Sequence, residues 1–230
     1  MLELKILSRL LDYPSEELWE NAQLVRDHIQ SAESFSDAGK AALLSLLDAI
    51  VDRDSIDAQE DYSALFDRGR SVSLLLFEHV HGDSRARGQA MVDLMSVYQR
   101  NGFEINAREL PDYIPLFLEY LSERPFHEVT EWVSDAAPIL SLLKARLEKR
   151  ESPYQAVFDT LLGWATEVPD LAPLRDTVAR EQPDDTPEAL DKIWEEEAVS
   201  FGGDAVNGGC PTPQRPVREV SSVKWVNEGI

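Results

Sequence analysis

The sequence predicts an all-α protein, a single-domain bundle of about eight to ten helices with a disordered C-terminal tail. Two observations favour this fold class. Apolar residues recur at helical spacing through most of the chain, as at Leu43, Leu47 and Ile50 and again at Leu94 and Tyr98. Only six of the 11 glycines lie before position 201, and no Asn-Gly or Asp-Gly pair joins two alternating runs as in a β-hairpin.

Local signals mark where the helices begin and end. Ser-Glu-Glu at 15–17 has the pattern of an N-cap followed by acids in the first turn. Asn-Gly at 101–102 should close a helix that begins near Asp83, and Thr-Pro-Glu at 186–188 should open another. The apolar run SVSLLLF at 71–77 lies between helical segments, and we expect it to be a buried helix as well.

The segment ELPDYIPLFLEYL at 109–121 predicts a turn or helix start followed by a core helix. Pro111 would occupy an early helical position, and Asp112 would favour the positive end of the helix dipole. An apolar face follows at Ile114, Phe117, Leu118 and Leu121. Such a stripe most often packs in a core.

The composition changes at position 201. Residues 201–220 contain four glycines and three prolines and show no apolar period. Such a segment cannot bury enough apolar surface to offset its loss of conformational entropy. We therefore expect an all-helical domain at 1–200 and a flexible tail at 201–230.

The charge of the chain restricts its partners. A net charge of -21 repels phosphate backbones and anionic lipid head groups, so the sequence predicts no nucleic acid partner and no membrane insertion, and it favours a basic polypeptide. Residues 151–200 hold 13 acids and 3 bases, whereas residues 61–110 hold 7 and 6. This contrast suggests a central functional surface beside an acidic flank. The alternative is that the acids only keep the protein in solution.

Compartment follows from cysteine usage and the opening residues. Cys210 is the single cysteine, so no internal disulfide, Cys-rich zinc site or iron–sulfur cluster can form. Glu3, Lys5 and Arg9 interrupt the opening apolar residues, which excludes a signal-peptide core and indicates a short amphipathic helix. The longest uncharged apolar stretch is far shorter than the roughly 20 residues of a membrane span. We expect a cytoplasmic protein.

The residues that could carry chemistry do not form a catalytic set. His79 and His81 lie in EHVHGD, whose imidazoles and carboxylates suit a metal. Residues two apart on a helix point about 200° from each other, however, and no HExxH, GxSxG, Walker or GxGxxG motif is present. We therefore predict a protein that is not an enzyme, with no catalytic residue, metal or cofactor. A His-based metal enzyme remains the less favoured alternative.

Arginines bracket the apolar run LLLFEHVH. Arg68 and Arg70 precede it, and Arg85 and Arg87 follow it, in a chain with few cations. They either pair with carboxylates and fix the packing of helices, or meet a carboxylate or carbonyl of a bound peptide.

Several blocks of sequence resemble one family. The opening ILSRLLDYPSEELW and the segments at 66–94, 108–121, 137–152 and 184–197 are similar to NarJ-type nitrate reductase assembly chaperones, also called delta subunits. These belong to the TorD/DmsD/NarJ group of redox-enzyme maturation chaperones. The resemblance covers most of residues 1–200.

The resemblance implies an all-α protein that is not part of the finished enzyme. It implies binding of the N-terminal segment of the apo nitrate reductase alpha (catalytic) subunit in the cytoplasm, supporting insertion of the molybdenum cofactor and an iron–sulfur cluster before membrane docking. An amphipathic peptide helix in an apolar groove is a known mode of recognition, and an acidic body suits a basic peptide. The alternative is a structural adaptor that remains in the mature complex, and homodimer formation is left open.

Carried onto this sequence, the resemblance points to the motif at 109–121 and to the segment at 77–82. The peptide-binding candidates are His79, His81, Glu109, Asp112, Phe117, Glu119 and Tyr120. Which of them contact the peptide and which hold the groove is open.

Overall fold

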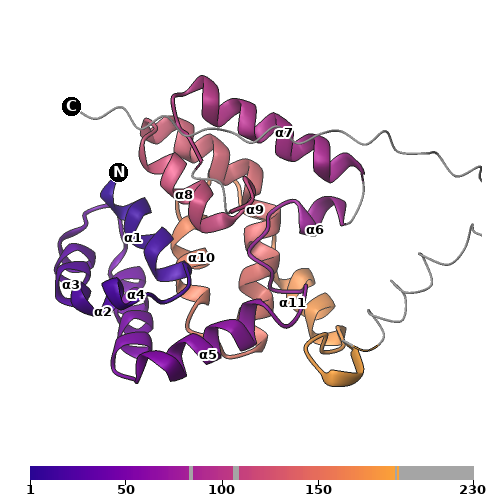
Figure 1. The fold of residues 1–230 in the computed structure, drawn as a ribbon, viewed down its shortest axis with the longest axis horizontal. Helices are drawn as coiled ribbons and strands as arrows, with labels where there is room; N and C mark the ends of the chain where they lie inside the picture. The colour runs from indigo at the N-terminus through magenta and orange to yellow at the C-terminus, as the bar shows by residue number, and fades with distance from the viewer. Residues whose placement is uncertain (83–84, 106–108, 190, 192–230) are drawn as a thin grey trace, which may run out of the picture. The chain divides into compact units, whose positions relative to one another are not determined.

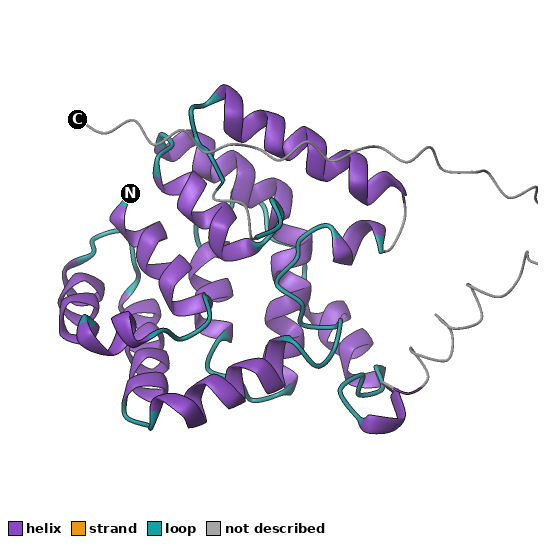
Figure 2. Ribbon diagram, viewed as in Figure 1, coloured by secondary structure: helices purple, strands orange, loops and turns teal. Residues whose placement is uncertain are grey.

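Helices form where apolar residues repeat at helical spacing, and they dominate the computed structural model, which describes residues 1–82, 85–105, 109–189 and 191 (Figures 1 and 2). Within these residues the helices are α1 (Leu2–Leu11), α2 (Glu16–Glu20), α3 (Ala22–Ser31), α4 (Asp37–Val51), α5 (Ser55–Phe66), α6 (Glu78–His81), α7 (Arg85–Arg100), α8 (Ile114–Ser122), α9 (Phe126–Lys149), α10 (Gln155–Leu162) and α11 (Leu171–Arg180). The expected all-α class is confirmed. The count slightly exceeds the expected range because α2 and α6 span only five and four residues.

Residues Met1–Leu190 form one compact unit. The expected domain boundary at position 200, the tail at 201–230 and Cys210 lie outside the described residues, so these remain predictions. No helix in the described part of the chain is long and apolar enough to cross a bilayer.

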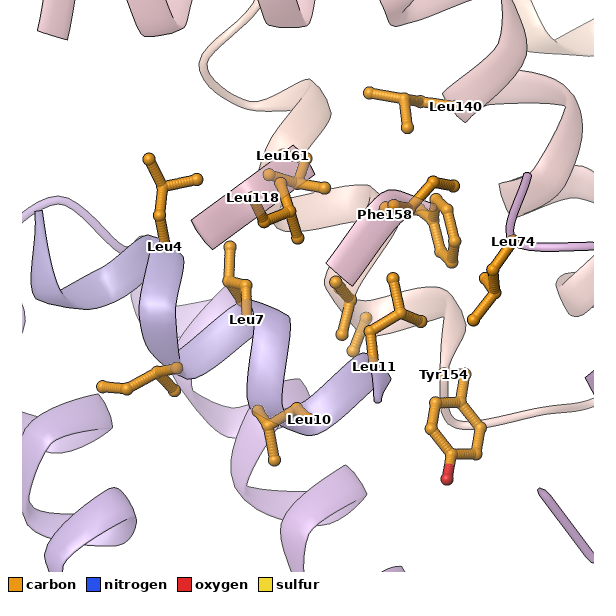
Figure 3. Packing of buried hydrophobic residues seen from close by; sticks show 14 of the residues in the cluster. Leu4, Leu7, Leu10, Leu11, Leu74, Leu118, Leu140, Tyr154, Phe158 and Leu161 are labelled. Atoms are coloured by element: carbon orange, nitrogen blue, oxygen red, sulfur yellow. The ribbon is translucent and has the colours of Figure 1, made fainter. Parts of the chain in front are cut away.

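The core forms where α1 packs on α8 and where α10 packs on α9 and α4. Leu7 and Leu11 of α1 lie among Leu118 of α8 and Phe158 and Leu161 of α10 (Figure 3). These side chains are all at most 2% exposed. Burying one side chain of this kind stabilises the fold by about 1.5–3 kcal/mol, so this cluster fixes how the central helices pack.

Side chains cap several helices. The Ser36 hydroxyl accepts a hydrogen bond from the Gly39 N–H at the start of α4, and Asp54 and Asp170 cap α5 and α11 in the same way. The predicted end of α7 is confirmed, because the helix stops at Arg100 and Gly102 adopts a positive φ of 72°.

The expectation of a buried helix at 71–77 is wrong. The segment is irregular and pairs with the chain before α8 through a single antiparallel bridge. The Leu76 N–H donates to the Asp112 carbonyl (3.0 Å), and the Ile114 N–H donates to the Leu74 carbonyl (2.8 Å). A short apolar run without a clear period does not distinguish a buried helix from an extended segment. Here the chain before α8 supplies the backbone hydrogen-bond partners of the segment.

The sequence predicted either a turn or a helix start for the motif before α8, and the motif forms a turn. The Tyr113 N–H donates to the Leu110 carbonyl across Pro111 and Asp112 (3.0 Å). The proline in the first turn of α8 is therefore Pro115 rather than Pro111, and Asp112 precedes the helix instead of facing its dipole.

Candidate functional site

An apolar pocket opens on the surface where the end of segment 71–77 meets α6, α7, α8 and α9. It has a volume of about 240 Å³, and we call it the groove. Its lining residues are Leu76, Phe77, Val80, His81, Leu94, Phe117, Trp132, Asp135, Ala136 and Ile139. The groove therefore gathers side chains from five separate parts of the chain.

Aromatic rings and one acid shape the groove. Trp132 meets Phe117 edge to face, with ring centroids 5.6 Å apart, and Phe77 lies 6.1 Å from the ring of His81. Val80 is 56% exposed, so an apolar side chain faces solvent there. Asp135 is exposed and has no salt bridge within the described residues, which leaves its charge available to a ligand. Such a surface suits an apolar side chain with a cation beside it.

Asp112 is fully buried and hydrogen-bonds to the backbone of the groove wall. Its Oδ2 atom accepts a hydrogen bond from the Phe77 N–H (3.0 Å), and its carbonyl accepts one from the Leu76 N–H (3.0 Å). Oδ1 has no hydrogen-bond partner among the described residues. Asp112 therefore fixes two groove residues through their backbone and does not itself reach solvent.

His79 and His81 have different surroundings on α6. The Nε2 atom of His79 lies 2.7 Å from the Ser73 carbonyl, which requires a proton on Nε2. Burial lowers the pKa of His79, and the positive charge of Arg146 acts in the same direction, against the hydrogen bond to Ser73. His81 instead lines the groove. In the described part of the chain, no three His, Cys, Asp or Glu side chains gather as a metal site would require.

The other candidates lie away from the groove or in the core. Tyr120 is 1% exposed, and its ring packs against Tyr98 with centroids 4.6 Å apart. Glu119 faces α1, where it lies 3.4 Å from an Arg9 guanidinium nitrogen. Glu109 is exposed just before the turn. Of the seven candidates, His81 and Phe117 line the groove, and His79 and Asp112 support it.

The contribution of α9 to the groove was not predicted from the sequence. Trp132, Ala136 and Ile139 lie at i, i+4 and i+7, the spacing of one helix face. A second stripe at Val129, Val133, Ala137 and Leu140 is buried in the core. Two adjacent apolar stripes on one helix are the signal that could have revealed this wall.

One arginine singled out in the sequence, and two that were not, make ion pairs in the described part of the chain. Arg70 lies 3.8 Å from Glu78, which supports the pairing hypothesis for this residue. Arg146 of α9 and Arg150, directly after that helix, make several hydrogen bonds and ion pairs to Ser71, Glu181 and Asp184.

Comparison with known proteins agrees with the resemblance in the sequence. Residues 32–159 match the family described as nitrate reductase delta subunit. The chain is 50% identical over 210 residues to the nitrate reductase molybdenum cofactor assembly chaperone NarJ of Escherichia coli (strain K12), covering 91% of this chain and 88% of that protein. It is 44% identical over 202 residues to the probable chaperone NarW of the same strain, covering 86% and 83%.

A more distant relative is the probable chaperone NarJ of Bacillus subtilis (strain 168). It is 29% identical over 157 residues, covering 68% of this chain and 84% of that protein. These relatives are named as chaperones of enzyme assembly and not as enzymes. The chain therefore belongs to the nitrate reductase delta-subunit family of molybdenum cofactor assembly chaperones.

Proposed function

We propose that this protein binds the N-terminal segment of the apo nitrate reductase alpha subunit in the cytoplasm. It supports insertion of the molybdenum cofactor and an iron–sulfur cluster before the enzyme docks on the membrane. The relatives' role in nitrate reductase cofactor assembly supports the choice of partner. The observation that carries the proposal is the apolar groove between α6, α7, α8 and α9.

The groove suits one apolar anchor of an amphipathic helix. Its walls are aromatic and aliphatic, and apolar burial would supply most of the affinity. The volume accommodates a few side chains rather than a whole helix, so the remaining peptide would lie on the surrounding surface.

Charge would orient the peptide rather than hold it. Asp135 adds a carboxylate to an apolar surface, and the chain as a whole carries a charge of -21. A peptide with a basic residue beside its apolar anchor gains attraction at this edge, while acidic segments are repelled. Release requires only that cofactor insertion or membrane docking gives the peptide segment more favourable contacts elsewhere.

Calorimetry with the N-terminal peptide of the alpha subunit from the same organism tests the proposal. We expect saturable binding with a negative heat-capacity change, which is the mark of apolar burial. Val80→Asn should weaken binding by about tenfold, because it places an amide in the apolar contact.

Val92→Asn is the matched control for this variant. Val92 is 59% exposed, much like Val80, but does not line the groove. Binding should stay within about twofold of the unmodified protein. Equal losses in the two variants, or no loss in Val80→Asn, would place the peptide elsewhere.

A further inference from the structure

Asp184 is bound by the residue that begins the irregular segment 71–77. Its Oδ2 atom accepts a hydrogen bond from the Ser71 N–H (2.7 Å), and its Oδ1 atom accepts one from the Ser71 hydroxyl (2.7 Å). Arg150 Nη2 donates to the same Oδ1 atom (3.1 Å). One carboxylate thus receives three donors from two parts of the chain that are 113 and 34 residues away. Charge-assisted bonds of this kind are stronger than neutral ones.

The loop before Ser71 is shaped around this carboxylate. A Cβ atom at Gly69 would lie 2.8 Å from the Asp184 carboxylate carbon and from both of its oxygens. Real Cβ atoms essentially never come this close, so any larger residue at Gly69 must displace Asp184 or the loop. The contact therefore depends on a glycine as well as on the charged groups.

Arg146 of α9 and Arg150, the residue directly after α9, complete the attachment of Ser71. Arg146 Nη1 donates to the Ser71 carbonyl (2.8 Å), and Arg150 Nη2 donates to the Ser71 hydroxyl (3.0 Å). The amide, hydroxyl and carbonyl of Ser71 are then all engaged. Burial would raise the pKa of Asp184, but the hydrogen bonds from Ser71 and the charge of Arg150 lower it overall. The carboxylate is accordingly charged at neutral pH.

Ser71 leads directly to the groove wall. Val72 is fully buried and Leu74 is 4% exposed, and the same segment then presents Leu76 and Phe77 to the groove. Because the segment is not helical, it depends on partners elsewhere in the chain for its position. Asp112 is such a partner at the far end of the segment, where it accepts a hydrogen bond from the Phe77 N–H.

We propose that Asp184 is a positioning residue of the groove, acting through Ser71 to place the wall formed by Leu76 and Phe77. This inference rests on the proposed function of the groove. It assigns a role in binding to the acidic segment after α11, whose described residues do not line the groove. Loss of the contact loosens the wall and weakens the peptide's fit while the helical core stays intact.

The first test compares Asp184→Ala with Asp185→Ala in the full chain. Asp185 is the matched control, because it lies 3.9 Å from the same Arg150 and makes no hydrogen bond to Ser71. We expect Asp184→Ala to weaken binding of the alpha-subunit peptide by about fivefold or more, and Asp185→Ala by less than about twofold. Equal effects of the two substitutions would overturn the proposal.

Amide hydrogen exchange separates positioning from general stability. In Asp184→Ala, exchange should accelerate at residues 72–77 and stay unchanged in α1. The exchange measurement does not depend on the proposed function. If the unmodified protein fails to bind the peptide, the function is wrong, while the exchange result still decides whether Asp184 holds the segment. Unchanged exchange at residues 72–77 would refute the positioning role.

Gly69→Ala supplies an independent way to break the contact. The added methyl group should push the Asp184 carboxylate away and weaken peptide binding to a similar extent. If both substitutions act through one contact, the double variant should bind no more weakly than Asp184→Ala alone. A double variant whose loss equals the product of the two single losses would show that Gly69 and Asp184 act separately, and would overturn the proposal.

Discussion

Two helices of the chain, α1 and α7, are held very differently. α1 has 10 residues and buries Leu4, Ile6, Leu7, Ser8, Leu10 and Leu11. α7 has 16 residues and buries only Leu94 and Tyr98, while Val92 and Met95 stay exposed. α1 belongs to the packed core, and α7 lends one of its two buried side chains to the groove.

The difference shows where the molecule can respond to a ligand. Regions with many buried apolar contacts open only with the whole fold, whereas sparsely packed regions open at lower free energy. The groove lies between these extremes, because α8 and α9 each bury many side chains, whereas α7 buries two and α6 buries none. We expect a bound peptide to shift the wall formed by α6 and α7, while the wall formed by α8 and α9 stays in place.

The largest effect is expected from removing a core side chain of α1. Leu7 is fully buried, so Leu7→Ala should lower the free energy of unfolding by about 2–5 kcal/mol. Leu94→Ala should cost less, because fewer neighbours surround α7, but should weaken peptide binding. Urea denaturation and calorimetry measure the two effects. A Leu94→Ala loss of stability as large as that of Leu7→Ala would contradict the comparison.

A smaller effect is expected at Asp112. Asp112→Ala leaves the Phe77 N–H without its acceptor, which should cost about 1–3 kcal/mol of stability. Asp112→Asn keeps an oxygen acceptor at that position and should cost less. Urea denaturation of both variants checks the order, and a milder loss in the alanine variant would show that the hydrogen bond to Phe77 contributes little.

The helices could be predicted because apolar spacing and helix-end residues are local signals. The end of α7 at residues 101–102 and the apolar face of α8 are examples. The segment 71–77 could not be assigned, since its backbone partners lie at 112–114. No local pattern encodes such a pairing.

The site was predictable only in part. His81 and Phe117 were identified from motif segments and do line the groove. Tyr120 was a peptide-binding candidate, yet its side chain is buried and its hydroxyl accepts a hydrogen bond from the Asn101 side chain. Trp132 and Asp184 were missed, because their roles depend on contacts with residues far away in the sequence.

Asp135 offers a sharper test of the exposed side of the groove. Asp135→Asn should weaken binding of the basic peptide by about threefold and reduce its dependence on salt, since the lost charge is exposed. Glu131→Gln is the control, being an exposed acid one turn away on α9 that does not line the groove. Calorimetry at two salt concentrations compares them. Identical salt dependence in both variants would mean that only the overall charge matters.

The smallest expected effect is a pH dependence from His79, which ties α6 to Ser73. Burial lowers the pKa of His79 below its ordinary value of 6.5, so between these two values the unfolded chain binds more protons than the folded one. The stabilisation is therefore complete above pH 6.5 and declines as the pH falls toward the lowered pKa. His79→Gln can still donate to the Ser73 carbonyl but does not titrate, so its stability should vary less between about pH 7.5 and pH 5.5. Urea denaturation at both pH values, with His81→Gln as the control from the same helix, measures the effect. If unmodified protein and His79→Gln lose stability in parallel on acidification, another group is responsible, and α6 is held by packing rather than by a neutral imidazole.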